Sequence, residues 1–243
     1  MLHNININKM NQLMAENEDV KQIITQLLEN HHTAVSTISH EIRNPLTLVS
    51  SSLQLVQSQH PEVKEFCNWK QIMEDIDFMR QLLEELSLFN NGNLLHYSVF
   101  SMEKLLKNIA ISYAISLDEE DSDIELISSI PSDLGDFTGD RIKLEEVFLN
   151  LLRNAKDAVS ANGFIRLSAL RRDDLLIIKV EDNGCGIPEE HLQSIFEPFK
   201  TYKQGGTGLG LSLSLQIIKA HKGSIEVQSQ LDKGTTFTIA LPI

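Results

Sequence analysis

Glycine is missing from the first 91 residues of this 243-residue chain, and all 12 glycines lie between Gly92 and Gly234. Cysteine is also scarce: Cys67 and Cys185 lie far apart, and no Cys/His spacing is typical of a zinc site. We therefore expect neither a disulfide nor a structural zinc ion. Because glycine marks turns and bends, its distribution predicts two different parts with a boundary near residue 92.

Long apolar runs and an excess of positive charge are lacking as well. No run approaches the length of a membrane span, about 18 apolar residues, and the N-terminus has no basic and then apolar signal pattern. The 21 Lys and Arg against 34 Asp and Glu give a net charge of −13, which argues against binding to nucleic acid or to an anionic membrane. We expect a cytoplasmic protein with no nucleic-acid partner and no membrane contact within this chain.

The glycine-free part has the apolar spacing of long helices. Alternating steps of three and four residues, typical of helices packed in a bundle, occur in two series. The first comprises Val35, Ile38, Ile42, Pro45, Val49, Leu53 and Val56, and the second Trp69, Ile72, Ile76, Met79, Leu83 and Leu86. Residues 58–62 predict a turn, with Pro61 in the first turn of the second helix. Such an antiparallel hairpin leaves its apolar seam half covered, so we expect a dimeric four-helix bundle.

The same spacing continues upstream at Val20, Ile24, Leu27 and Ala34, which predicts an N-terminal helical extension (residues 1–30) before the hairpin (residues 31–92). Beyond the linker Asn90-Asn91-Gly92-Asn93 the pattern changes. We predict helices at 102–116, 141–160 and 209–220, and strands at 124–128, 163–170, 175–181, 224–229 and 235–241. This order, without regular βαβ repetition, favours an α+β sandwich over residues 97–243.

His40 is the histidine with the most informative surroundings. At about 100° per residue, it falls on the opposite side of its helix from the mean direction of Ile38 and Ile42, so we expect its ring to face solvent. Glu41 lies beside it, and Asn44 follows one turn later. An exposed neutral imidazole next to a carboxylate is a competent nucleophile at neutral pH. On these grounds alone, an ordinary surface histidine is the alternative.

The segment Ser39-His40-Glu41-Ile42-Arg43-Asn44-Pro45-Leu46-Thr47 is similar, almost letter for letter, to the phospho-acceptor box of sensor histidine kinases. In that family the box lies on the first helix of a dimeric hairpin. The resemblance implies that His40 accepts a phosphoryl group from ATP while Glu41 takes the displaced proton. It also implies that Asn44 orients a water when the protein dephosphorylates the receiver domain of a response regulator.

Residues 146–158 resemble the first segment of the ATP-binding domain shared by histidine kinases, gyrase, heat-shock chaperones and mismatch-repair ATPases. Asn150, Asn154 and Asp157 are spaced by four and three residues, so they share one helix face. By resemblance Asn154 is the metal ligand, and its neutral amide oxygen suits a magnesium ion that keeps most of its waters. ATP-hydrolysing relatives carry their water-activating glutamate at the position of Asn150. An amide cannot act as that base, which disfavours a hydrolytic ATPase.

Residues 181–188 resemble a second segment of the same domain, directly after a predicted strand. The resemblance implies that Asp182 accepts a hydrogen bond from the adenine amino group. It also implies that Gly184 and Gly186 let the backbone approach the base, although a glycine turn after a strand is common without any ligand.

Two further segments complete the resemblance. Residues 195–203 are similar to the phenylalanine box of the mobile lid, in which Lys203, and less closely Lys200, would reach phosphate oxygens; solvated lysines are the alternative. Residues 205–211 open a helix, where N–H groups freed by glycines can cradle a triphosphate. The expected cradle comprises Gly206, Thr207, Gly208, Leu209 and Gly210.

Together these segments imply a sensor histidine kinase core, in which an all-α hairpin that dimerises into a four-helix bundle precedes an ATP-binding α+β sandwich of the Bergerat type. The implied cofactors are ATP and Mg²⁺, and the implied partners are a second copy of the chain and a response regulator. A non-catalytic ATP-binding dimeric scaffold and a phosphatase-only regulator of a partner remain alternatives. The roughly 30 residues before the acceptor helix are too few for a sensor domain, so we expect a fragment of a larger receptor or a signal received from a partner.

Overall fold

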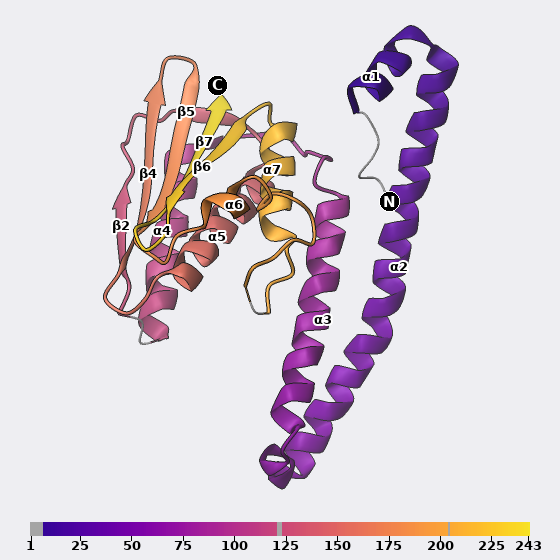
Figure 1. The fold of residues 1–243 in the computed structure, drawn as a ribbon, viewed down its shortest axis with the longest axis vertical. Helices are drawn as coiled ribbons and strands as arrows, with labels where there is room; N and C mark the ends of the chain where they lie inside the picture. The colour runs from indigo at the N-terminus through magenta and orange to yellow at the C-terminus, as the bar shows by residue number, and fades with distance from the viewer. Residues whose placement is uncertain (1–6, 121–122, 204) are drawn as a thin grey trace. The chain divides into compact units, whose positions relative to one another are not determined.

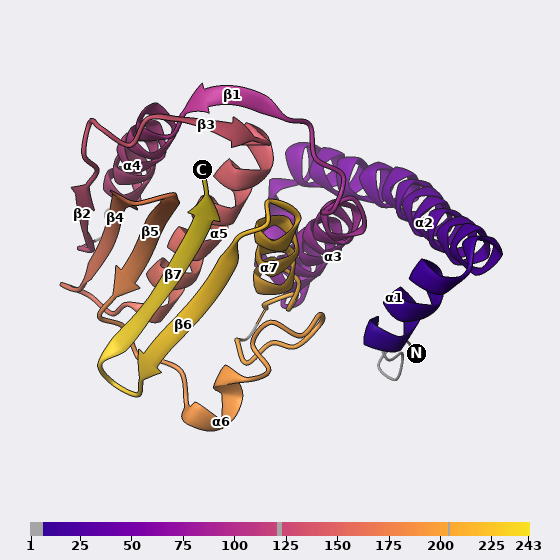
Figure 2. The same ribbon diagram turned by 90° about the horizontal axis from the view of Figure 1, so that it is seen from above.

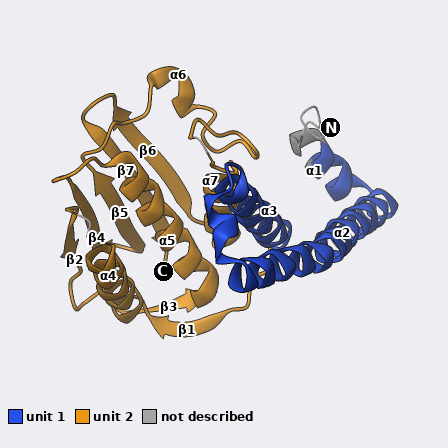
Figure 3. Ribbon diagram, turned by 90° about the horizontal axis from the view of Figure 1, so that it is seen from below, with its two compact units in different colours: residues 1–91 blue, residues 92–243 orange. Residues whose placement is uncertain are grey.

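The computed structural model describes residues 7–120, 123–203 and 205–243, and residues 1–6 of the predicted N-terminal extension lie outside this description. The chain divides into two compact units, residues 1–91 (unit 1) and residues 92–243 (unit 2), which Figure 3 colours separately. Unit 1 is helical, and unit 2 combines strands and helices (Figure 1). This arrangement confirms the predicted fold class, a helical hairpin followed by an α+β domain.

Unit 1 consists of helices α1 (Ile7–Glu16), α2 (Glu18–Gln59) and α3 (Trp69–Asn90), with the 3-10 helix η1 (Pro61–Glu65) between the last two. Helix α2 begins after Asn17, whose side-chain oxygen accepts the N–H groups of Asp19 and Val20 at 2.9 and 3.2 Å. It continues through Pro45 without interruption. Pro45 has no N–H to donate to the carbonyl of Glu41, and the exposure of Glu41 lets water take that place.

The connection between the two long helices is longer than predicted. Pro61 begins η1 rather than the second helix, and α3 starts only at Trp69. Val63 of η1 is buried, while Phe66 has extended dihedral angles (φ −68°, ψ 131°) that end the 3-10 helix. The prediction for Pro61 is therefore wrong, because the burial of Val63 favours an extra turn that the apolar spacing of the two helices does not reveal.

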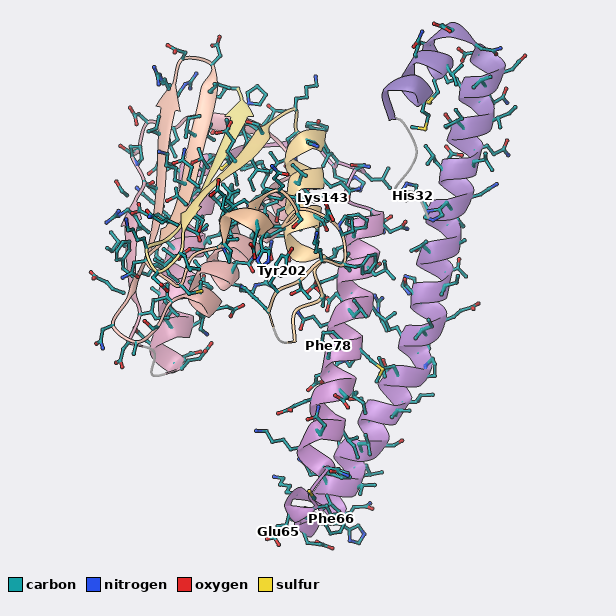
Figure 4. All side chains as sticks on the ribbon, in the orientation of Figure 1. His32, Glu65, Phe66, Phe78, Lys143 and Tyr202 are labelled. Atoms are coloured by element: carbon teal, nitrogen blue, oxygen red, sulfur yellow. The ribbon has the colours of Figure 1, made fainter. Side chains whose placement is uncertain are left out.

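Polar side chains fix the register of α2 against α3. At one end, Nδ2 of Asn90 donates to the carbonyl of His32 at 2.7 Å, and its Oδ1 lies 2.9 Å from Nδ1 of the same histidine, which is labelled in Figure 4. At the other end, Nε1 of Trp69 donates to Oε1 of Gln57 at 2.8 Å. Between them Ser50 is buried. A slip of the two helices would break these pairs, so they specify one alignment.

The apolar series of unit 1 are only partly buried within the hairpin. Ile76 and Leu83 are buried, but other aliphatic side chains on both helices are 38–54% exposed. This exposed set, here called the apolar seam, comprises Ile38, Ile42, Val49, Val56, Ile72 and Met79. The expectation that one hairpin leaves its seam half covered is confirmed. Aliphatic side chains exposed at heptad spacing indicate a face that another helical surface covers.

Unit 2 is built on a mixed five-stranded sheet with helices on one face (Figure 2). In sheet order the strands are β2 (Glu125–Ser129), β4 (Phe164–Arg172), β5 (Leu175–Asp182), β7 (Gly234–Pro242) and β6 (Ser224–Gln230). Strand β2 is parallel to β4, and the other neighbours are antiparallel. The covering helices are α4 (Met102–Glu119), α5 (Arg141–Ala158) and α7 (Gly210–Ala220). Phe148 and Leu151 of α5 are fully buried, as are Ile165 and Ile178 of the sheet.

The predicted strands and helices of unit 2 are all present, with ends within three residues of the predictions. The short strands β1 (Ser98–Ser101) and β3 (Asp136–Gly139) were not predicted; they form a separate antiparallel pair, and α6 (Glu189–Leu192) is also additional. Four-residue elements are too short to show an apolar period. No helix in the described part of the chain is long and apolar enough to cross a lipid bilayer.

A buried histidine joins the C-terminal end of α7 to the N-terminal end of α5. Nδ1 of His221 donates to the carbonyl of Ile217 at 2.8 Å, and Nε2 accepts the N–H of Asp140 at 2.9 Å. These roles require a neutral ring with its proton on Nδ1. Burial lowers the pKa of His221, and it outweighs the opposing effects of the Ile217 carbonyl and the Asp140 carboxylate, while the charge of Lys143 lowers it further.

Acidification is therefore expected to destabilise unit 2 through His221. Because its pKa is lower in the folded chain than the unfolded value of about 6.5, the neutral ring stabilises fully above about pH 6.5, and this contribution is lost as the pH falls toward the folded pKa. His221→Gln should be about 1–2 kcal/mol less stable near neutral pH but should lose less stability on acidification. Thermal unfolding of the parent and of His221→Gln, followed by circular dichroism at neutral and at acidic pH, measures this difference in stability. Equal losses in the two proteins would contradict the assignment.

Candidate functional site

His40 lies on α2 with its ring in solvent. The structure exposes His40, Glu41 and Asn44, whereas Ser39 is buried. Oγ of Ser39 donates to the carbonyl of Val35 at 2.7 Å, which satisfies the one polar side-chain group that this turn buries. The outward position of the imidazole agrees with the helical periodicity. A ring in this position is open to a phosphoryl group carried by another domain or molecule.

The polar face of α5 brings together the amides that the sequence placed on one side of a helix. Asn150 and Asn154 are half-buried and Asp157 is exposed, while Leu151 points into the core. Nδ2 of Asn150 donates to Oγ of Ser214 on α7 at 2.8 Å, and its Oδ1 lies 3.5 Å from Nδ2 of Asn154. Asn150 thus bridges α5 and α7, and it has no basic group that could activate a water. Sequence reasoning missed Ser214, whose contact spans two helices distant in sequence.

Lys203 reaches this face from the lid segment. Its Nζ donates to Oδ1 of Asn154 at 2.9 Å and to the carbonyl of the same residue at 3.3 Å, and it pairs with Oδ2 of Asp157 at 3.2 Å. The neighbouring Lys200 pairs instead with Glu197 at 3.4 Å. Of the two candidate lid lysines, the structure therefore brings only Lys203 to the predicted site. Because Lys203 and Asp157 are both substantially exposed, their ion pair contributes less than about 1 kcal/mol, and a ligand can displace it.

The side-chain oxygens of Asn154 and Asp157 already hold a positive charge, the Lys203 ammonium group. Within the described residues, no three or more His, Cys, Asp or Glu side chains form a group that could hold a metal ion. A divalent cation at this face would accordingly need oxygens from a second source. The phosphates of a nucleotide supply such oxygens, and magnesium commonly binds in this shared way.

Asp182 ends β5 in a buried position. Its Oδ1 accepts the N–H groups of Gly184 at 2.8 Å and Thr235 at 3.3 Å. Since both bonds use Oδ1, Oδ2 is the oxygen left for a ligand among the described contacts. Burial raises the pKa of Asp182, and the N–H donors of Gly184 and Thr235 and the charge of Lys203 oppose the rise only in part.

The glycines after Asp182 fit against the backbone of the protein itself. A Cβ on Gly184 would lie 2.4 Å from the carbonyl oxygen of Ala158, and one on Gly186 would lie 2.1 Å from that of Gln230. Gly186 also has a positive φ of 71°. These contacts exclude a side chain at both positions without any ligand. The closer approach of a base to the backbone here stays a prediction.

The glycine-rich segment is folded against the lid. A Cβ on Gly206 would lie 2.6 Å from Oγ1 of Thr201, and one on Gly208 would lie 2.6 Å from the nitrogen of Lys200. The carbonyl of Gly208 accepts the N–H of Phe199 at 3.0 Å. The lid and the expected cradle are therefore one connected structure, so a movement of either will move the other.

The same segment leads into α7 beside the amides of α5. Gly210 is the first residue of α7, and a Cβ there would lie 2.4 Å from Oδ1 of Asn150. Leu209 is fully buried, so its side chain belongs to the core of unit 2. Oγ1 of Thr207 accepts the N–H of Leu209 at 3.3 Å. The predicted phosphate cradle thus borders Asn150, one helical turn before the predicted metal ligand Asn154, although cradle and helix lie far apart in sequence.

The lid has a second anchor that sequence reasoning missed. The ring of Tyr202, labelled in Figure 4, stacks on His191 with centroids 3.6 Å apart and planes at 11°. Its hydroxyl group also lies 2.9 Å from Oγ of Ser194. Tyr202 and Lys203 therefore anchor the lid to two different elements, Tyr202 to the α6 region and Lys203 to α5. No periodic signal links these residues, because the lid is an irregular segment.

Comparison with known families agrees with this architecture. Residues 31–92 match the family described as the His Kinase A (phospho-acceptor) domain, and residues 139–243 match the family described as Histidine kinase-, DNA gyrase B-, and HSP90-like ATPase. The fold and site thus define a phospho-acceptor domain followed by an ATP-binding domain. The chain belongs to the sensor histidine kinases and carries the two domains of their catalytic core.

Two curated relatives illustrate the similarity. The chain is 35% identical over 209 residues to the signal transduction histidine-protein kinase AtoS of Escherichia coli (strain K12), and the aligned region covers 85% of this chain and 34% of AtoS. It is 31% identical over 207 residues to sporulation kinase C of Bacillus subtilis (strain 168), and this aligned region covers 85% of this chain and 47% of the relative. The chain therefore spans less than half the length of either relative.

Solved structures show the same two-part fold. The structure of full-length ShkA in complex with AMPPNP has a TM-score of 0.73 at 25% identity, over 86% of this chain and 45% of that chain. The histidine kinase AdeS of Acinetobacter baumannii has a TM-score of 0.54 at 27% identity, over 84% of this chain and 97% of that chain. These likenesses extend over both units.

Proposed function

We propose that this chain is a cytoplasmic ATP-dependent protein-histidine kinase, which phosphorylates its own His40 and passes the phosphoryl group to an aspartate of a response regulator. The observation that supports this most directly is the use of Asn150. At the position where a hydrolase needs a base, this side chain is an amide bonded to Ser214. A site that binds ATP without activating water conserves the phosphoryl group for another acceptor, and the exposed His40 is available.

In the proposed reaction, the unprotonated nitrogen of the His40 ring attacks the γ-phosphorus of ATP. The bond from that phosphorus to the bridging oxygen breaks, and ADP leaves with the electron pair. Glu41 takes the proton from the other ring nitrogen, so the phosphohistidine is neutral at the ring. Positioning and charge neutralisation do most of the work in such a transfer.

The nucleotide would be held by residues already close together in unit 2. Oδ2 of Asp182 would accept the adenine amino group, and the backbone from Gly206 to Gly210 would face the phosphates. Lys203 would exchange its contact with Asn154 for a phosphate oxygen, since the ion pair that holds it is weak. The lid would then close on the nucleotide because lid and cradle are joined through Gly208.

Asn154 and Asp157 fit a magnesium ion that accompanies the nucleotide, because their oxygens already hold an ammonium group. When bound, Mg²⁺ would neutralise phosphate charge, which a chain of net charge −13 otherwise repels. Asn154 would hold the ion through Oδ1. The departure of Lys203 from that oxygen makes room for it.

We infer that the functional form is a homodimer. The apolar seam carries heptad-spaced aliphatic side chains on both α2 and α3, each 38–54% exposed in the single chain. A second copy of the same hairpin presents the same heptad spacing and would bury both seams in a four-helix bundle. His40 is exposed on the same helix, so pairing through the seam leaves it open to the nucleotide and to a docked receiver domain.

The kinase proposal is tested by incubating the full chain with Mg²⁺ and ATP labelled at the γ-phosphate. We expect label on the protein that survives alkali and is lost in acid, moves to an added receiver domain, and is abolished by EDTA. Nucleotide binding without labelling would instead support a non-catalytic scaffold. Steady release of phosphate without labelled protein would support a hydrolytic ATPase.

A second activity, dephosphorylation of the receiver domain, is favoured by Asn44, which is exposed one turn after His40. Its amide can orient a water toward an aspartyl phosphate held beside the helix. Asn44→Ala is expected to slow dephosphorylation of a phosphorylated receiver domain by about 100-fold, while labelling of His40 persists. The measurement is the decay of a labelled receiver domain mixed with each protein. Equal decay rates would remove this activity from the proposal.

A further inference from the structure

The segment that enters unit 2, residues 92–98 (the linker segment), is held by side chains that the proposed reaction does not use. Lys143, in the first turn of α5 and labelled in Figure 4, donates from Nζ to the carbonyl of Gly92 at 3.2 Å and to the carbonyl of Leu94. One lysine therefore binds two carbonyls of the same short segment. Such contacts restrain the backbone whatever the side chains of the segment are.

Asp140 continues this set of contacts. Its Oδ2 accepts the N–H of His96 at 2.9 Å, and its Oδ1 accepts the N–H of Lys143 at 3.1 Å, which caps α5. Its own N–H donates to His221. The linker segment is thus bonded to the N-terminal end of α5 at Gly92, Leu94 and His96.

Helix α7 provides a third contact with the linker segment. A Cβ on Gly92 would lie 2.8 Å from Cδ of Gln216, so a side chain at this position would displace the end of the Gln216 side chain on α7. The same two helices carry Asn154 on α5 and Ser214 on α7. The linker segment is therefore attached to the helices that shape the proposed nucleotide site, and it must move with them.

The charged groups of this cluster are partly withdrawn from water. Asp140 is only 4% exposed; burial opposes its ionisation, but the N–H groups of His96 and Lys143 and the nearby Lys143 charge together lower its pKa. Burial lowers the pKa of Lys143, and Asp140 opposes this. Withdrawing a lysine from water carries a free-energy cost. The two bonds from Lys143 to the carbonyls of Gly92 and Leu94 restrain the linker backbone, and they accompany this desolvation of the lysine.

Unit 1 is bonded up to its last residue. The N–H of Asn91 donates to the carbonyl of Ser87 at 3.2 Å, and its Nδ2 donates to the same carbonyl at 3.0 Å. Asn90 is paired with His32. The bonded structure of unit 1 therefore ends at Asn91, and that of unit 2 resumes at Gly92.

We propose that Lys143 is a positioning residue that shortens the tether between the two units by holding residues 92–98 to unit 2. The inference rests on the proposed kinase function, because tether length sets how often the γ-phosphoryl group meets an acceptor histidine in the bundle. Releasing the linker segment would add residues 92–98 to the tether. Once a tether is longer than the span it bridges, effective concentration falls roughly as the 3/2 power of its length, so a tether lengthened about fivefold lowers it by about tenfold.

The test is Lys143→Met in the full chain. We expect the rate of autophosphorylation at saturating ATP to fall about tenfold, while the Kd for ATP stays within about twofold. Lys143→Arg keeps donors for the two carbonyls and should restore the rate. Arg141→Met removes an exposed charge from the same helical turn and should change neither quantity. An unchanged rate in Lys143→Met, or a parallel loss of rate and ATP affinity, would overturn the inference.

Two further measurements keep a damaged fold or an inactive kinase from obscuring the result. Amide hydrogen exchange at His96 should be at least about tenfold faster in Lys143→Met than in the parent. Hydrogen exchange does not depend on kinase turnover. Equal exchange rates in the two proteins would therefore overturn the inference even if the kinase proposal failed. Insertion of two glycines between Asn91 and Gly92 lengthens the tether without touching Lys143. This insertion should also slow autophosphorylation, and a rate equal to that of the parent would overturn the inference.

Discussion

Replacing His40 with glutamine is expected to reduce incorporation of labelled phosphate to background while ATP binding is retained. Glutamine has a similar size and polarity but no unprotonated ring nitrogen to attack phosphorus. Because His40 is exposed, its replacement should change the free energy of unfolding by less than about 0.5 kcal/mol. A loss of labelling would thus report on chemistry rather than on folding.

The chain provides a matched control for this experiment. His31 is exposed on the same helix, so His31→Gln makes the same change outside the phospho-acceptor box. Calorimetry with ATP and gel autoradiography, applied to both variants, separate binding from transfer. Labelling that persists in His40→Gln would refute the assignment of the acceptor. Labelling lost equally in both variants would point to a general effect on α2.

The predictable part of the site was the part encoded within single helices. The spacing of Asn150, Asn154 and Asp157 placed them on one face of α5, and the periodicity around His40 gave its exposure. Both follow from the regular geometry of the α-helix, which needs no knowledge of the tertiary fold. The contact of Lys203 with Asn154 was not predicted, since spacing cannot join an irregular lid to a distant helix, and the resemblance implied only that Lys203 reaches phosphate oxygens.

The hairpin of unit 1 shows what apolar periodicity does not reveal. The apolar series located both helices, but the second series mixes two faces: Ile76 and Leu83 are buried within the hairpin, while Ile72 and Met79 are exposed. Apolar periodicity identifies a bundle helix without saying which partner covers each residue. The polar pairs that fix the register, such as Trp69 with Gln57, were not found, because hydrogen-bonded polar residues resemble ordinary surface positions in a sequence.

Replacing Asp182 with asparagine is expected to weaken ATP binding by at least about 100-fold, which corresponds to about 2.8 kcal/mol. The new Oδ1 can still accept the N–H groups of Gly184 and Thr235, so the local fold should persist. The NH₂ group would then stand at the position of Oδ2. Two donors, this amide and the adenine amino group, would face each other in a buried site, so the hydrogen bond would be lost and both groups left unsatisfied.

Calorimetric titration with ATP measures this effect, and Asp232→Asn supplies the control. Asp232 lies in the exposed turn between β6 and β7 with a φ of 59°, a conformation that asparagine also adopts readily. The control should bind ATP as the parent does. If Asp182→Asn binds ATP with parental affinity, the adenine is not recognised at Asp182, and the nucleotide must lie elsewhere on unit 2. If it binds adenosine normally and loses only ATP, the carboxylate acts on the phosphate and metal end of the site.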